Sequence, residues 1–303
     1  MVRFIAQRLL SMVLVSVAVV YFGFLGMHMM DNWRGEEPGY HLREDAGLAL
    51  NDSLAFYGDL LQGDLGEVEL VSGPQPVVTI LQETYLRSMG LLLLALAAAS
   101  VVGLLVGSLA ALARRSGTQY MLLLATIIGV SAPSFLIAIL LQQGGITYTR
   151  TFGSRLVSMG GYGWDFQHLA LPLLVLGARP VAYLTRTSYL ALSRIMEEDY
   201  IRTAFAKGLS MGRTVLTHAL RNFAVPFLTG VGVSLRFSLS TLPLVEFIFA
   251  WPGMGLQILE AIQGQIPILV VSIALILGLT IQLIGLLLDI VYSIVDPRVR
   301  DET

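Results

Sequence analysis

The chain has 303 residues, of which 55% are hydrophobic and 13% are charged, and its formal net charge at pH 7 is -2. So large an apolar fraction excludes an ordinary soluble domain and predicts an all-α integral membrane protein. The absence of cysteine excludes disulfides, zinc–thiolate sites and thiol chemistry.

The first apolar stretch follows a basic start at Arg3 and Arg8, as in a secretory signal. Its apolar part is about 20 residues long, which is enough to cross a bilayer, and no small-x-small cleavage site comes after it. We therefore expect residues 1–30 to form a retained N-terminal transmembrane helix.

Residues 31–88 are rich in aspartate and glutamate and are expected to form an extracytoplasmic loop or cap. A short helix is predicted near residues 53–61, followed by a turn at Gly63–Gly66, where the sequence reads GDLG. A solvated acidic surface explains most of these carboxylates without a binding role.

Six stretches are long and apolar enough to span a membrane, which predicts six transmembrane helices. They cover residues 8–30, 89–112, 121–141, 169–192, 227–249 and 268–295. The third stretch is short, and Pro133 should kink it. Residues 89–296 would then form a five-helix core, and residues 297–303 a cytoplasmic tail.

The second span has a small residue at every fourth position, which places all of them on one helix face and predicts close approach of another helix. These residues are Ala95, Ala99, Gly103, Gly107 and Ala111.

Two further outer loops are expected after the third and fifth spans. Residues 142–168 are polar and rich in glycine. The turn Trp251–Gly255, with the sequence WPGMG, combines an interfacial tryptophan with a proline–glycine turn.

Basic residues are unevenly distributed between the two sides of the predicted membrane. If both termini are cytoplasmic, 11 of the 19 lysine and arginine residues lie inside and 5 lie outside. The positive-inside rule therefore predicts cytoplasmic N and C termini.

The polar segment 193–226 lies between two spans and cannot be placed in hydrocarbon. It contains Arg202, Lys207 and Arg213 beside acidic residues, and Gly208 interrupts its helical pattern. The sequence predicts two short amphipathic helices joined at a glycine turn on the cytoplasmic face. Such a shape is typical of a docking surface, and an ordinary basic loop is the alternative.

The common catalytic signatures are missing. Lys207 is the only lysine, and no GxxxxGK[ST] phosphate-binding loop surrounds it. None of the four histidines lies in an HExxH motif, and no GxSxG is present. We therefore expect a chain that is not an enzyme and that has no metal or cofactor of its own.

Ionisable residues inside the spans need an explanation, because an arginine at the centre of a membrane helix costs about 2.5–3.5 kcal/mol on insertion scales. Arg179 and Arg236 lie near the middle of their spans, and Arg186 follows Arg179 by seven residues on nearly the same face. Glu246 and Asp289 are candidate acidic partners. Interhelical pairing or snorkelling is one interpretation, and a translocation path that attracts carboxylates is the other.

Several motifs together resemble the B-type permease subunit of dipeptide, oligopeptide and nickel transporters, which is a type I ABC importer permease. The central motif is DYIRTAFAKGLS at Asp199–Ser210, which looks like the cytoplasmic EAA loop of that family. The others are the start at Arg3–Leu10, GDLG at Gly63–Gly66, Pro76–Val77, AYLTR at Ala182–Arg186, HALRN at His218–Asn222, Pro226, VEFIF at Val245–Phe249, WPGMG at Trp251–Gly255 and LLLDIVYSIVDPRVR at Leu286–Arg300.

The resemblance implies a type I ABC importer permease fold whose loop 193–226 contains a coupling helix. Arg202, Thr203 and Ala204 stand at the E-A-A positions, Gly208 is the glycine of the loop, and Lys207 and Leu209 flank it. With Asp199 and Tyr200, these residues would contact a groove of a cytoplasmic ATP-binding subunit. The translocation-path interpretation of the ionisable span residues, which comes from their positions and not from the resemblance, would have the pathway lined by Arg179, Arg186, Arg236 and Glu246.

The partners implied are a second, homologous permease, two ATPase subunits that bind ATP and magnesium, and an extracytoplasmic solute-binding protein. The location implied is the bacterial inner membrane, and no nucleic acid is involved.

The chain also departs from the family pattern. After GDLG the chain has Glu67 and Val68, whereas the family usually has a serine at the second of these positions. The third outer turn is short, and Arg179 and Arg236 stand where the family generally has small residues. Two extra cations favour an acidic cargo as a hypothesis.

Other functions remain as alternatives to the importer. A membrane scaffold or receptor could dock a soluble partner through the basic loop without transport. A secondary transporter is disfavoured because the two halves show no convincing internal repeat, and only the resemblance argues against export.

Overall fold

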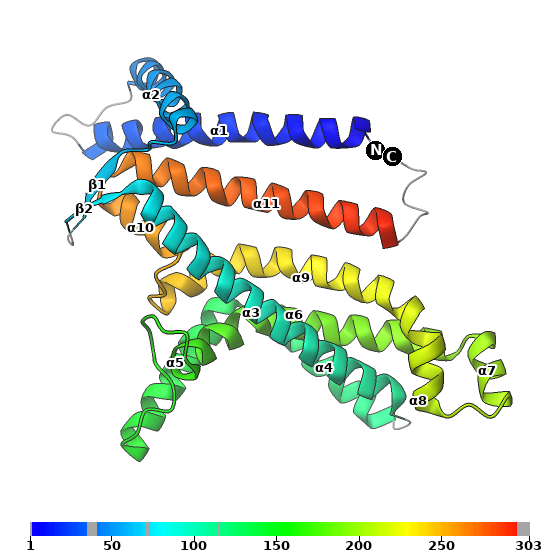
Figure 1. Cartoon of the computed structure of the whole chain (residues 1–303). Helices are drawn as coiled ribbons and strands as arrows, with labels where there is room; N and C mark the ends of the chain where they lie inside the picture. Colours follow the sequence, from blue (N-terminus) through cyan, green and yellow to red (C-terminus); the bar gives the residue numbers. More distant parts are fainter. Residues whose placement is uncertain (1, 35–40, 71–72, 114–115, 296–303) are drawn as a thin grey trace. The chain divides into compact units, whose positions relative to one another are not determined.

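The computed structural model describes residues 2–34, 41–70, 73–113 and 116–295 (Figure 1). The chain divides into two compact units. Unit 1 contains residues 1–88 and 252–291, and unit 2 contains residues 89–251. The predicted cytoplasmic tail, residues 297–303, lies outside the described part of the chain.

Within the described residues, five helices are long and apolar enough to span a membrane, judged by length and composition. Residues 124–131 and 134–152, which are bent by 98° relative to each other, add a sixth if they form one broken span. The long helices are α1 (Val2–Arg34), α3 (Val77–Leu112), α4 (Ser116–Ser131), α5 (Ser134–Phe152), α6 (Phe166–Met196), α9 (Leu220–Ile248) and α11 (Pro267–Val295). The predicted all-α membrane fold is confirmed.

The acidic segment after α1 has more regular structure than the sequence indicated. Helix α2 (Leu42–Gln62) is longer than the predicted short helix and ends at Gly63, whose φ of 76° is left-handed. The antiparallel strands β1 (Glu67–Leu70) and β2 (Gly73–Pro76) follow, with Glu67 opposite Pro76. Helix α3 then begins at Val77, twelve residues before the predicted start of the second span.

Unit 1 packs α1 against α2 and α11. The Phe24 and Phe56 rings meet edge to face at 6.0 Å, and His28 Nε2 lies 2.7 Å from Asp52 Oδ2. Gly23 allows close approach of α11, because a Cβ there would lie 2.9 Å from Val271 Cγ2. The short helix α10 (Met254–Gln263) begins where the Met254 amide donates to Ser88 Oγ at 2.7 Å.

Helices α6 and α9 form the centre of unit 2, and part of α3 packs against α6. A Cβ at Gly107 would lie 2.4 Å from the carbonyl oxygen of Thr185, and one at Gly103 would lie 2.6 Å from Leu184 Cβ. The stripe of small residues is therefore the surface where α6 approaches α3, which confirms the predicted close helix contact.

The predicted kink at Pro133 is a full break between α4 and α5. Pro133 has an extended ψ of 128° and directly precedes α5. That helix continues to Phe152 and ends at the left-handed Gly153, so the predicted loop 142–168 is wrong over residues 142–152. The helix continues through the glycine pair at 144–145 without a break. Gln142 Nε2 in the same helix donates to the Met159 carbonyl at 2.7 Å.

Candidate functional site

The polar segment between α6 and α9 forms a bend that we call the elbow, residues 197–214. Helix α7 (Asp199–Ala206) is followed by Gly208, which has a left-handed φ of 83°. The Gly208 amide donates to the Phe205 carbonyl at 2.9 Å, and the Leu209 amide donates to the Ala204 carbonyl at 3.2 Å. These bonds end α7, and a residue without a Cβ suits the left-handed position. The predicted glycine turn is confirmed.

The predicted second short helix does not end as expected. Helix α8 (Met211–Thr214) continues through a π-helical segment, η1 (Val215–Ala219), directly into α9. Residues 211–248 therefore form one continuous helical stretch. This π-helical segment, which inserts one residue into an otherwise regular helix, was not predicted from the sequence. Such turns occur frequently at functional sites.

One face of α7 anchors the elbow to the two long helices. Ile201 is fully buried and packs with Leu192 of α6 and with Ala219 and Phe223. Ala204, three residues further along α7, is also buried. Ile201 therefore connects α7 to both α6 and α9 by direct side-chain contact. Ala204 is buried on the same side of α7 as Ile201.

The rest of the surface of α7 is open to solvent, with charged side chains on it and the aromatic side chains of Tyr200 and Phe205 at the edges of the buried face. Tyr200 is 39% exposed and Phe205 is 37% exposed. Tyr200 accepts a hydrogen bond from Asn222 Nδ2 at 3.0 Å, which fixes the phenol. The ion pair of Arg202 with Asp199, at 3.4 Å, is highly exposed and contributes little to stability.

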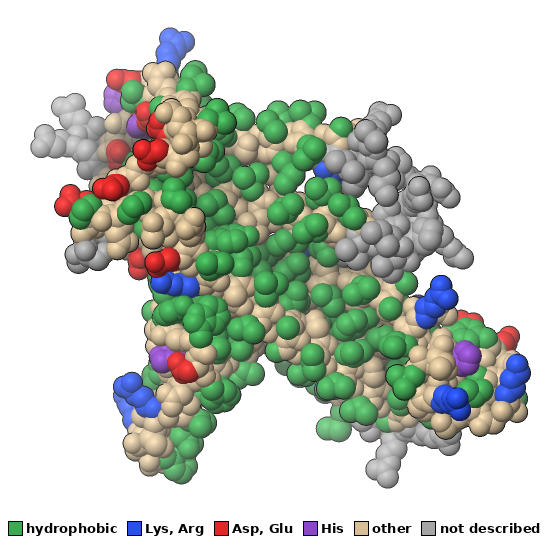
Figure 2. All heavy atoms as spheres, viewed as in Figure 1, with side chains coloured by type: hydrophobic (Ala, Val, Ile, Leu, Met, Phe, Trp, Pro, Cys, Tyr) green, Lys and Arg blue, Asp and Glu red, His purple; other side chains and the backbone are tan. Residues whose placement is uncertain are grey.

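The remaining residues predicted for this site lie around the same surface. Thr203, Lys207 and Gly208 are exposed, and Leu209 is half-buried. In unit 2, basic side chains gather at the end that carries α7 and α8 and at the tip of α5 (Figure 2). Seven of the eight predicted docking residues therefore share an accessible, partly cationic surface, and Ala204 lies beneath it.

Arg179 of α6 lies beside the break between α4 and α5. Its Nε donates to the Val130 carbonyl at 3.2 Å, and its guanidinium carbon lies 5.6 Å from the centre of the Phe237 ring. The break at Pro133 leaves carbonyls at the end of α4 without the amides of a continuous helix. Arg179 thus caps α4 where the sequence suggested a cavity or an acidic partner.

The other ionisable residues of the spans have different surroundings. Arg186 and Arg236 are exposed on α6 and α9, whereas Glu246 is fully buried. Asp289 is paired with Arg8 inside unit 1, which corrects its suggested pairing with a mid-span arginine. Exposed arginines on apolar helices need water or a partner.

The end of unit 2 opposite the elbow is held by aromatic and polar contacts. Trp251 is fully buried, with ring centres 5.0 Å from Tyr162 and 5.3 Å from Trp164, so it is a core residue and not the predicted interfacial one. Asp165 caps α6 by accepting from the Gln167 amide at 2.9 Å. The hydrogen bond from the His168 side chain lowers the pKa of Asp165 below its ordinary 3.8. The ionised Asp165 cap therefore contributes its full stabilisation at pH values above 3.8. This stabilisation is lost as the pH falls through the lowered pKa of Asp165.

Comparison with known proteins agrees with this architecture. Residues 103–301 match the family described as "Binding-protein-dependent transport system inner membrane component". The chain is 32% identical over 335 residues to the dipeptide transport system permease protein DppB of Haemophilus influenzae, covering 99% of this chain and 100% of that protein. It is 31% identical over 338 residues to the di/tripeptide transport system permease protein DppB of Pseudomonas aeruginosa, covering 100% of both.

A third relative, the glutathione transport system permease protein GsiC of Escherichia coli, is 28% identical over 319 residues, covering 99% of both chains. The similarity thus extends along both units and includes the elbow. The chain belongs to the family of binding-protein-dependent transport system inner membrane components and is a transmembrane permease subunit of an ABC importer.

Proposed function

We propose that the elbow couples this permease to a cytoplasmic ATP-hydrolysing subunit. The observation that carries the proposal is that α7 buries Ile201 against the two long helices and leaves Tyr200 and Phe205 partly exposed. A surface that is accessible to a partner and packed against two spans can transmit a movement of that partner to the spans. The residues that would form or support the contact are Asp199, Tyr200, Arg202, Thr203, Ala204, Lys207, Gly208 and Leu209.

ATP and magnesium are proposed to bind in the partner subunits. The sequence of this chain contains no GxxxxGK[ST] loop, so it offers no phosphate cradle of the P-loop kind. Closure of two ATPase subunits would move this chain and a second, homologous permease between inward-facing and outward-facing states. The cargo would arrive on an extracytoplasmic solute-binding protein.

The proposed setting is a bacterial inner membrane with both termini in the cytoplasm. The excess of basic residues on the elbow side supports this orientation. Residues 1–30 would form the N-terminal span, residues 31–88 the extracytoplasmic cap and residues 89–296 the permease core.

The cargo proposed is a peptide or a similar small solute. The relatives are named as permeases for dipeptides, di/tripeptides and glutathione. Arg186 and Arg236 are exposed on apolar helices, which supports a role on a wet path between two permeases. Arg179, which is half-buried, and Glu246, which is fully buried, would support the same path from behind its exposed surface. Acidic cargo would be favoured.

The coupling proposal is tested by capture of the ATPase subunits. We expect Phe205→Ser to reduce their recovery with the purified permease about tenfold, because truncating an interface aromatic commonly costs more than 1 kcal/mol and a tenfold change is about 1.4 kcal/mol. Leu61→Ser, which alters an exposed apolar residue of α2, is the matched control.

The two variants separate the importer from a docking scaffold. In an importer, the wild-type complex also shows ATPase activity that rises when the solute-binding protein is added, and Phe205→Ser loses this rise while Leu61→Ser keeps it. Equal capture and equal stimulation of the two variants would place the ATPase contact elsewhere.

A further inference from the structure

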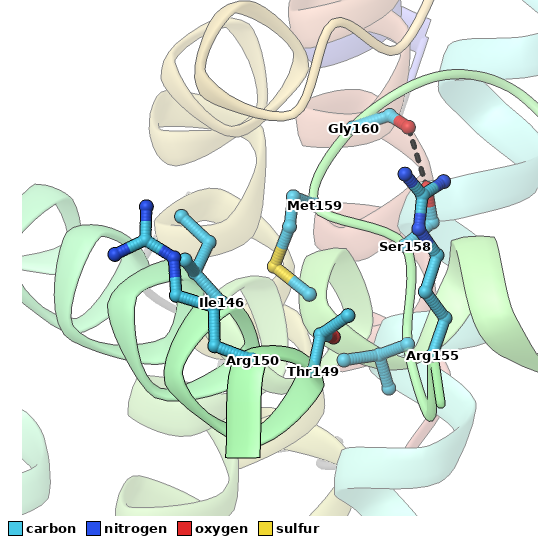
Figure 3. A pocket seen from close by; sticks show the side chains of 8 residues that line it. Ile146, Thr149, Arg150, Arg155, Ser158, Met159 and Gly160 are labelled. Carbon is cyan, nitrogen blue, oxygen red and sulfur yellow. Dashed lines mark hydrogen bonds between the residues drawn. The ribbon is translucent and has the colours of Figure 1, made fainter. Parts of the chain in front are cut away.

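A pocket of about 350 Å³ lies in unit 2 at the tip of α5, at the end of α6 opposite the elbow. Its walls come from the last turns of α5 and from the connection that leads to α6. Figure 3 shows Arg150 of α5 and Arg155 of the connection on either side of Met159. Neither arginine belongs to the elbow or to the mid-span set.

The connection that forms one wall is held in place at several points. The Ser158 amide donates to the Gln167 carbonyl at 2.8 Å, and the Gly161 amide donates to the Phe249 carbonyl at 2.8 Å. Met159 packs directly on α5, because a Cβ at Gly145 would lie 2.4 Å from Met159 Cε. These contacts tie the wall to α5, α6 and the end of α9, so the pocket is preformed.

The pocket is cationic. Arg150 and Arg155 are both exposed, and within the described part of the chain neither forms an ion pair and no acidic side chain lines the pocket. The hydroxyls of Thr149 and Ser158 donate to the carbonyls of Gly145 and Gly160, at 2.9 and 2.6 Å. The guanidinium groups are therefore the free donors, and they suit oxyanions such as phosphate and carboxylate.

The surroundings of the arginines distinguish between oxyanion sources. Tyr148, Phe152 and Leu156 are 36%, 66% and 55% exposed, and they alternate along the chain with the two arginines. Trp164 and Phe166, at the start of α6, are 48% and 73% exposed. Aromatic side chains beside arginines at the end of a membrane helix are typical of the boundary between lipid and water.

We propose that this pocket binds the phosphate headgroup of an anionic phospholipid, with the acyl chains lying along Phe152 and Leu156. The arginines hold the phosphodiester, and the apolar side chains give the preference for a lipid over a free anion. The site is independent of the coupling proposal, since it depends only on membrane insertion and on the arrangement of this end of unit 2.

The test uses the assembled transporter, purified in detergent and incubated with limiting phosphatidylglycerol or phosphatidylcholine. Lipid retained per complex is measured by native mass spectrometry. We expect the double variant Arg150→Gln/Arg155→Gln to retain at least fivefold less phosphatidylglycerol, with unchanged phosphatidylcholine. Arg43→Gln, which removes an exposed arginine of α2, should behave like the wild type.

Other outcomes identify other ligands and would overturn the proposal. If the double variant retains as much phosphatidylglycerol as the wild type, the two arginines do not form a lipid site. Full displacement of the lipid by an equal concentration of inorganic phosphate shows that the arginines bind phosphate without regard to the lipid. If the double variant loses capture of the solute-binding protein but retains phosphatidylglycerol as the wild type does, Arg150 and Arg155 serve protein docking. Circular dichroism and thermal unfolding confirm that the variants are folded before these comparisons.

Discussion

At the scale of single residues, Gly208 is the clearest case in which backbone geometry and function meet. It ends α7 in a left-handed conformation, and a Cβ at this position would have no heavy atom within 4 Å. A substitution there tests backbone strain alone, without a steric clash.

We expect Gly208→Ala to cost about 1–2 kcal/mol of local stability, because the left-handed conformation is unfavourable for residues with a Cβ. The rate of cargo uptake by the Gly208→Ala transporter should fall, and protease cleavage within the elbow should become faster. Gly212→Ala is the control, since Gly212 lies in α8 with open space around it and alanine favours helix. Indistinguishable proteolysis and uptake in the two variants would show that the left-handed turn is dispensable.

Arg179 gives a second prediction at this scale, because its hydrogen bond satisfies the Val130 carbonyl at the break of α4. Arg179→Met keeps a long side chain but removes the donor, and we expect it to lower the free energy of unfolding by about 1–3 kcal/mol. The thermal midpoint of the purified chain is the measurement. Arg186→Met, at an exposed position of the same helix, should change it less. A larger effect at Arg186 would contradict the capping role.

At the scale of elements, the contact between α3 and α6 depends on the absence of side chains at Gly103 and Gly107. Gly107→Ala puts a methyl group 2.4 Å from a backbone oxygen, which cannot move as a flexible side chain can. We expect a loss of about 1–3 kcal/mol, as is typical of overpacking. Gly285→Ala in α11, where nothing lies within 4 Å, should be neutral. Equal melting temperatures for the two variants would mean that α6 does not approach α3 this closely.

The sequence predicted elements best where one physical signal dominated. Hydrophobic length located the spans, and Gly208 located the turn of the elbow. The extension of α5 to Phe152 was missed because the glycine pair at 144–145 and the polar residues around it are typical of loops. The hairpin of β1 and β2 was missed as well, since four-residue strands with two prolines in the second carry little strand signal.

At the scale of the whole molecule, the mid-span arginines lead to a prediction about cargo. If Arg236 faces the path, acidic peptides should compete for uptake more strongly than basic peptides of equal length. Arg236→Gln should reduce this preference severalfold while leaving recovery of the ATPase subunits unchanged. Competitive uptake into proteoliposomes measures both, with Arg43→Gln as a charge-matched control. Stronger competition by basic peptides, or an unaltered preference in Arg236→Gln, would remove acidic selectivity from the proposal.

The amino-acid sequence alone determined that the chain enters a membrane, about where it crosses and where a polar elbow interrupts it. These features depend on composition and local pattern, because continuous apolar helices are stable in lipid and charged side chains are not. Only the tertiary structure decided that Ala204 is buried beneath the elbow, that Arg179 caps α4 and that Trp251 is a core residue. Each of these depends on which distant segment lies beside the residue, and hydrophobic pattern does not specify that neighbour.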